Sequence, residues 1–224
     1  MNSNLLGYLI TKPREAINNL LPDKYISVTL CMADVLPYFS LPNKGDIYRS
    51  QYGWSSIPKN VMENIDKWIH DNLVFEKYFQ SGYFHSLEQS KTFIENFLPH
   101  EKDILILGIY LDEQDYDFFM TNDYFMNQAK NYFPISKKIK YDNQGNILGY
   151  EVFGTEYGWI NGHDTKCNNL TNDIKDKFGY LPNNFGLYNS FYETREIIKW
   201  TDSEEFHGEP VPYISIMIVD YSDK

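Results

Sequence analysis

The stretch from Asn161 to Leu170, NGHDTKCNNL, sets His163, Asp164 and Cys167 close together in the chain. Imidazole, carboxylate and thiolate groups are the side chains that a metal site or an activated thiol requires. A helix start explains the same residues, because Asp164 can cap a first turn and Cys167 opens an apolar series with helical spacing. We therefore predict that Asp164 is a helix cap and Cys167 is buried, and we keep His163 as a candidate binding residue.

A second group of potential ligands lies near the C-terminus, in SEEFHGEPVP from Ser203 to Pro212. If folding brings His207 and Glu209 beside His163, two imidazoles and a carboxylate could hold zinc or a similar ion. A solvated surface loop accounts for the same residues. No Gly-rich phosphate loop, Gly-x-Ser-x-Gly turn or His-Glu-x-x-His helix occurs in the sequence. We therefore expect no catalytic residues and no cofactor, and a metal site at His163, His207 and Glu209 is a hypothesis.

Two similar halves carry these residues, as the repeated Tyr-Gly-Trp at 52–54 and 157–159 indicates. The two glycines are 105 positions apart (158 − 53). A longer match pairs GYFHSLEQSKTFIEN, from Gly82, with GLYNSFYETREIIKW, from Gly186, at a spacing of 104 (186 − 82). Nearly equal spacings favour an internal duplication.

Each half also contains two predicted helices. The first has apolar residues at intervals typical of a helix that buries one face. These residues are Met62, Ile65, Ile69 and Leu73 in one half, and Cys167, Leu170, Ile174 and Phe178 in the other, where Gly179 can end the helix. The second helix begins with a capping box, formed by Ser86 with Gln89 and by Ser190 with Glu193. These boxes predict helices over about 87–97 and 191–200.

Strands are predicted on both sides of these helices. The segments 103–111 and 212–221 are rich in β-branched and aromatic residues. In the second half, 136–154 reads as two extended runs joined by a turn around Asn143 to Asn146. The first half offers two alternatives, which both remain open: 23–32 with 45–50, or NLLGYLI from Asn4 aligned with NILGYEV from Asn146.

The predicted fold class is α+β, with an internal duplication of a β-β-α-α-β unit arranged about a pseudo-twofold axis. The first repeat, with an N-terminal extension, covers residues 1-111, a helical connector covers 112-135, and the second repeat covers 136-224. Units of this size bury little surface alone, so we expect them to share one sheet or to pack face to face.

The repeated Tyr-Gly-Trp segments have two interpretations. Glycine permits a tight turn and tryptophan anchors it to the core, so the motif occurs twice because the scaffold needs it twice. Alternatively, the aromatic residues line a shared binding groove, since tyrosine and tryptophan are enriched at interfaces. The candidate binding residues are then Tyr52, Trp54, Tyr157, Trp159 and His163.

Net charge restricts the partners that the chain can bind. It has 31 acidic and 20 basic residues, a net charge of −11, so its field repels nucleic acid and anionic membranes and attracts basic proteins. Two cysteines are too few for a disulfide framework, and no apolar run is long enough to span a membrane. We expect a cytoplasmic protein, and its oligomeric state stays open.

The second half resembles a group of bacterial proteins of unknown function, through ILGYEVFG, LPNNFGLYNS and GEPVPYISIMIVDY. This resemblance covers the last 80 residues or so and implies no activity. By analogy of charge and size with toxin-neutralising proteins, we predict a non-catalytic acidic binding protein, immunity-like or regulatory, with a basic protein as partner. The alternative is a small metal-dependent or hydrolytic enzyme with a site near His163 and His207.

Overall fold

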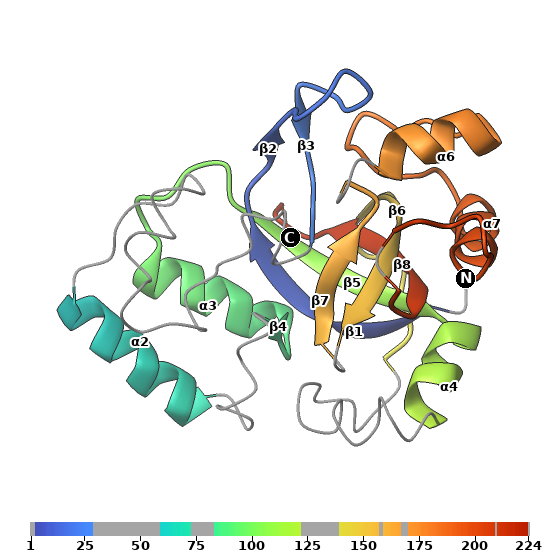
Figure 1. Cartoon of the computed structure of the whole chain (residues 1–224). Coiled ribbons are helices and arrows are strands. Elements are labelled where there is room, and N and C mark those ends of the chain that lie inside the picture. Colours follow the sequence, from blue (N-terminus) through green and yellow to red (C-terminus); the bar gives the residue numbers. More distant parts are fainter. Residues whose placement is uncertain are drawn as a thin grey trace.

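The structure is a computed structural model that describes residues 3–28, 59–72, 83–121, 139–156, 159–166, 170–208 and 210–223. Its strands are β1 (Ser3–Thr11), β2 (Arg14–Glu15), β3 (Lys24–Tyr25), β4 (Tyr83–Phe84), β5 (Leu105–Asp112), β6 (Asn146–Glu156), β7 (Trp159–Asp164) and β8 (Tyr213–Asp220). Its helices are α2 (Lys59–Asn72), α3 (Leu87–Phe97), α4 (Glu113–Thr121), α6 (Leu170–Phe178) and α7 (Phe191–Thr201). Helices and antiparallel strands together make an α+β fold, as predicted (Figure 1).

Six strands form one antiparallel sheet in the order β4-β1-β5-β8-β6-β7, and β2 pairs with β3 in a small separate sheet. The first three strands of this order come from the N-terminal half of the chain and the last three from the C-terminal half. The halves meet where β5 pairs with β8 (Figure 1). Of the two arrangements that the sequence left open, the shared sheet is the one observed.

The outer strand pairs of the two halves have the same register. In β1–β5 Tyr8 faces Gly108, and in β6–β8 Tyr150 faces Met217. Both strand pairs also have a register shift at the same place, directly before Gly7 in β1 and directly before Gly149 in β6. NLLGYLI and NILGYEV, which contain these glycines, thus hold the same place in the sheet.

The central pair is centred on two isoleucines. Ile109 of β5 faces Ile218 of β8, with two further residue pairs on each side. The pairs next to it are Gly108 with Val219 and Tyr110 with Met217. An axis through the isoleucine pair would therefore relate β5 to β8.

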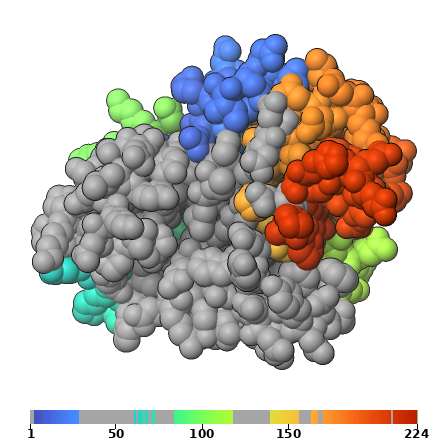
Figure 2. Space-filling view, viewed as in Figure 1, coloured from blue at the N-terminus to red at the C-terminus, as the bar shows by residue number. Residues whose placement is uncertain are grey.

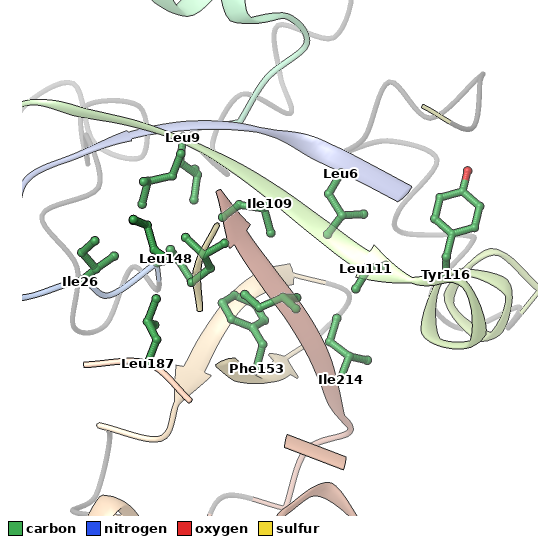
Figure 3. Packing of buried hydrophobic residues seen from close by; sticks show 14 residues of the cluster. Leu6, Leu9, Ile26, Ile109, Leu111, Tyr116, Leu148, Phe153, Leu187 and Ile214 are labelled. Carbon is green, nitrogen blue, oxygen red and sulfur yellow. The ribbon is translucent and has the colours of Figure 1, made fainter. Parts of the chain in front are cut away.

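The two faces of the sheet bury different clusters, because neighbouring residues of a strand point to opposite sides. On one face Leu9, Ile109 and Phe153 pack together, and Tyr116 of α4 and Leu187 pack against the same cluster (Figure 3). The four remaining helices pack on the other face. There α2 and α3 form one cluster with the β1 end of the sheet, and α6 and α7 form another with the β6 end.

These two helix clusters use buried residues at corresponding places. The paired positions are Ile10 with Val152, Ile65 with Leu170, Phe84 with Tyr188, and Phe93 with Ile197. The backbone pairing of Phe84 and Tyr188 is also similar. Phe84 pairs with Tyr8 of β1, and Tyr188 forms an isolated β-bridge with Tyr150 of β6.

Both predicted capping residues are confirmed. Ser86 Oγ accepts a hydrogen bond from Gln89 N at 3.1 Å, and Ser190 Oγ accepts one from Glu193 N at 3.2 Å. In the second box, the Glu193 carboxylate reaches back to Asn189 N at 2.8 Å, one residue before the cap. The helices that follow span Leu87–Phe97 and Phe191–Thr201, within a residue of the prediction.

One local prediction is wrong, and the structure distinguishes between the two alternatives for the first strand. Asp164 is not a helix cap, because it ends strand β7 opposite Phe153, and α6 begins only at Leu170. In the alternative that begins at residue 23, the described residues 23–28 contribute only β3, which pairs with β2 outside the shared sheet. β1 takes the place beside β5, as the rival alignment from Asn4 requires.

Candidate functional site

The predicted binding residues fall partly outside the described residues. Those outside are Tyr52, Trp54, Tyr157 and Glu209, and so is Cys167, whose burial stays a prediction. Trp159 is the first residue of β7 and pairs with Glu156. Whether the Tyr-Gly-Trp residues form a groove is therefore not tested by the structure.

The two histidines of the hypothetical metal site lie on different elements. His163 is half-buried in β7 opposite Gly154, whereas His207 is exposed in the segment between α7 and β8. Among the described residues, no three His, Cys, Asp or Glu side chains form a group that could hold a metal ion. The metal site stays a hypothesis, because its third ligand, Glu209, is outside the described residues.

A buried ion cluster, made of Glu151, Asp164 and Lys166, joins β6 to the end of β7. Lys166 Nζ forms an ion pair with Glu151 Oε2 and lies 3.9 Å from Asp164 Oδ2. None of the three side chains is solvent-exposed, since the side-chain exposure of each is 0%. Glu151 itself faces Ile216 of β8 in an otherwise apolar part of the sheet.

Hydrogen bonds hold the carboxylates of the buried ion cluster in place. Glu151 Oε1 accepts from Thr165 Oγ1 and from Val152 N, both at 2.8 Å. Asp164 Oδ2 accepts from Ser27 Oγ at 2.6 Å, so the segment after β3 is tied to β7. Buried charges persist when they are paired and hydrogen-bonded in this way. Because water does not reach it, the cluster is suited to fixing the backbone and not to binding a ligand.

A second ion cluster links the two halves of the chain. Arg195 of α7 forms an ion pair with Asp112 at the end of β5, and its Nη2 lies 3.1 Å from Asp115 Oδ2. Asp115 Oδ2 also accepts from Ser215 N at 3.0 Å. Burial raises the pKa of Asp115, although the bond from Ser215 N and the charge of Arg195 oppose that rise. The cluster therefore attaches the start of α4 to the second half.

Tyrosines lie between α3 and α7 on the helix-covered face. The Tyr110 and Tyr221 hydroxyls are 2.6 Å apart, and the Tyr8 ring meets the Tyr221 ring edge-on at 5.5 Å. Burial raises the pKa of Tyr110, and it raises the pKa of Tyr221 to about 12. These phenols stay protonated at neutral pH, so they cannot act as general bases there.

An aromatic strip lies at the ends of α6 and α7 and in the segments that follow them, where most of its members are half-buried against the α6–α7 cluster. We define it as Phe178, Tyr180, Tyr192, Trp200 and Phe206. Phe178 stacks on Tyr180 with ring centroids 5.5 Å apart, and its other neighbour Trp200 lies 6.0 Å away. Trp200 in turn meets the Phe206 ring edge-on at 5.1 Å.

Tyr192 is the most exposed member of the aromatic strip, with 68% of its surface accessible. Partial desolvation, then the nearby Tyr192, Glu196 and Glu193, raise the pKa of Tyr180. The strip therefore continues from α6 to the outward face of α7, and carboxylates border it there. The acidic rim of the strip is Glu193, Glu196, Asp202, Glu204 and Glu205.

Neither the buried ion cluster nor the aromatic strip was predicted from the sequence. Glu151 carried a usable signal, because strand alternation places it on the same face as Phe153 within the apolar run LGYEVFG. Aligning NLLGYLI with NILGYEV puts Leu9 opposite Glu151, which marks the charge as a feature of one half only. For the strip, the signal was Tyr192, which aligns with the charged Glu88.

Comparisons with protein-family models, with curated proteins and with solved structures found no match to this chain. Among the described residues, no helix is both long and apolar enough to cross a membrane.

Proposed function

We propose that this chain is a non-catalytic acidic binding protein, an immunity-like or regulatory partner of a basic protein in the bacterial cytoplasm. The observation that supports the proposal is the excess of acidic over basic residues in the chain. The chain has 31 acidic and 20 basic residues, which gives a net charge of −11. A surface of this kind attracts a basic protein at long range and speeds its encounter.

Ion pairs within the chain neutralise positive and negative charge equally, so the acidic excess remains. Lys177 pairs with Glu205 at 2.5 Å, and Lys199 pairs with Glu196 at 2.6 Å. Exposed carboxylates occur on both halves and include Glu63, Glu88, Glu95, Asp103, Asp142, Asp173, Asp176, Asp202 and Glu204. A basic partner would therefore meet negative charge from several sides.

The experiment is affinity capture from a lysate of the source bacterium, with the purified chain as bait, in low salt and in about 0.5 M salt, where the Debye length falls to a few ångströms. We expect a basic protein to be recovered at low salt. The captured protein, once purified, should bind the chain directly, with an association rate that falls as salt rises. Recovery of no protein in either buffer, or of partners that are not basic, would contradict the proposal.

We further infer that the chain arose by duplication of a β-β-α-α-β unit, with repeats at residues 1-111 and 136-224 joined by 112-135. Three similarities support this inference: the register of β1–β5 and β6–β8, the caps at Ser86 and Ser190, and the paired positions of the two helix clusters. An experimental structure tests it by superposition. If β1, α3 and β5 could not be laid over β6, α7 and β8, the inference would fail.

A further inference from the structure

Two members of the aromatic strip differ in type from the residues that align with them in the first half. Tyr192 and Trp200 of α7 align with Glu88 and Asn96 of α3, although the buried positions of the two helices match. Phe93 and Ile197, for example, hold corresponding places in the two helix clusters. The other strip residues, Phe178, Tyr180, Trp200 and Phe206, pack against the α6–α7 cluster, so Tyr192 is the member whose exposure the packing does not explain.

The aromatic strip already accommodates a cation from its own chain. Lys177 Nζ lies 6.0 Å from the centroid of the Phe178 ring and 5.9 Å from that of Trp200. These distances are within the range of cation–π attraction, which favours tryptophan and tyrosine faces. Lys177 also pairs with Glu205, so one ammonium group uses both the strip and its acidic rim.

The acidic rim gives this surface its charge. Five carboxylates border the strip, whereas Lys177 and Lys199 are the lysines paired within it, so the patch is negative. Figure 2 shows α6 in orange beside α7 and its following segment in red, side by side on one face of the molecule. An exposed tyrosine such as Tyr192, beside half-buried aromatic rings and within a charged rim, is characteristic of protein-binding surfaces.

We propose that the aromatic strip and its acidic rim are the docking surface for the basic partner, and that they hold its arginine or lysine side chains. This inference rests on the proposed function and adds a location to it. A guanidinium or ammonium group of the partner would lie over Tyr192 and Tyr180 and pair with Glu193 and Glu196. That arrangement repeats the one that Lys177 makes with Trp200 and Glu205.

The experiment measures binding of a nona-arginine peptide to the whole chain, and locates it by hydrogen exchange or amide chemical shifts. In the wild-type chain we expect the changes to concentrate at residues 176–206. Tyr192→Ala and Glu196→Gln together should weaken binding on the order of tenfold. The matched control is Glu88→Gln at the corresponding place on α3, which also removes one negative charge and should change affinity less than about twofold.

Fold is monitored by the melting temperature of each variant, which should stay near that of the wild type because Tyr192 and Glu88 are exposed. The proposed docking surface is contradicted if the exchange or chemical-shift changes caused by the peptide spread over the whole molecule. It is also contradicted if the α3 control variant weakens peptide binding as much as the α7 variant does. The same variants are then tested with the partner from affinity capture. A partner that binds the α7 variant unchanged overturns the location alone, whereas the absence of any basic partner overturns the proposed function.

Discussion

Replacing Glu151 by leucine tests the buried ion cluster, and leucine is the residue at the corresponding place in β1, Leu9. The substitution leaves Lys166 buried without its ion-pair partner, and it removes the acceptor for Thr165 Oγ1 and Val152 N. Breaking a buried pair on one side costs about 3–5 kcal/mol, against a typical total stability of about 5–15 kcal/mol. Asp164 stays near Lys166 Nζ, at 3.9 Å, so we expect the lower end of that range, about 3 kcal/mol.

The companion variants complete a double-mutant cycle. Lys166→Met leaves the Glu151 and Asp164 carboxylates buried together, so it should cost at least as much as Glu151→Leu. The double variant replaces the Glu151–Lys166 pair with apolar side chains but leaves Asp164 buried without a nearby cation, so it should be more stable than Lys166→Met and about 1–3 kcal/mol less stable than the wild type. The coupling free energy between the two positions is then on the order of 3 kcal/mol or more.

The assay is urea unfolding followed by tryptophan fluorescence and by far-ultraviolet circular dichroism. Equal slopes for all variants would show that only the free energy of unfolding changes. Asp71→Ala provides the control, because Asp71 pairs with Lys67 on the exposed surface of α2, where such pairs contribute about 0.5 kcal/mol or less. A loss below about 1 kcal/mol for Glu151→Leu, or a double variant no more stable than the weaker single variant, would refute the reasoning.

Three further predictions concern single residues. Burial lowers the pKa of His85, so the unfolded chain takes up the proton first and stability falls as pH drops below about 6.5; His85→Asn should flatten that fall in unfolding titrations. Gly149→Ala places a Cβ 2.7 Å from the Leu187 side chain and should cost about 3 kcal/mol, whereas Gly179→Ala, with φ +73° and open space, should cost only about 1–2 kcal/mol by urea unfolding. The pKa of Tyr110 is raised in the folded state, so stability is lost as pH rises above about 10, and Tyr110→Phe should reduce that loss in alkaline unfolding curves.

Each of these predictions has an outcome that contradicts it. If the stability of His85→Asn falls with decreasing pH as steeply as that of the wild type, then groups other than His85 cause the loss of stability in acid. Equal losses for Gly149→Ala and Gly179→Ala would mean that the contact with Leu187 is not close in solution. If Tyr110→Phe loses as much stability at alkaline pH as the wild type does, then the raised pKa of Tyr110 is not the cause of that loss.

Local signals were sufficient to predict the helices after Ser86 and Ser190 and the strands β5 and β8. A capping box acts within four residues, and a run of β-branched and aromatic residues favours a strand without help from distant parts. The observed positions of these helices and strands agree with the predicted ones. The α+β class follows from them.

Asp164 was misread because its local pattern favours a cap while its tertiary contacts make it part of a strand. In the folded chain its carboxylate accepts from Ser27 Oγ, 137 positions away, and from Lys166 N. Neither contact produces a regular spacing of residue types that could be recognised in the sequence. Buried Lys166 is hidden for the same reason, since a lysine is exposed in most proteins unless a partner carboxylate is placed beside it.

The pairing of β5 with β8 affects how the protein unfolds. Five residue pairs join the strands, so removal of either half would expose unpaired backbone N–H and C=O groups along the central strand of the other. Each half thus completes the hydrogen bonding of its neighbour, and we expect the whole chain to melt in a single cooperative transition. Amides in β5 and β8 should exchange only when both halves open together, so a weakness introduced in one half should lower the protection of the other.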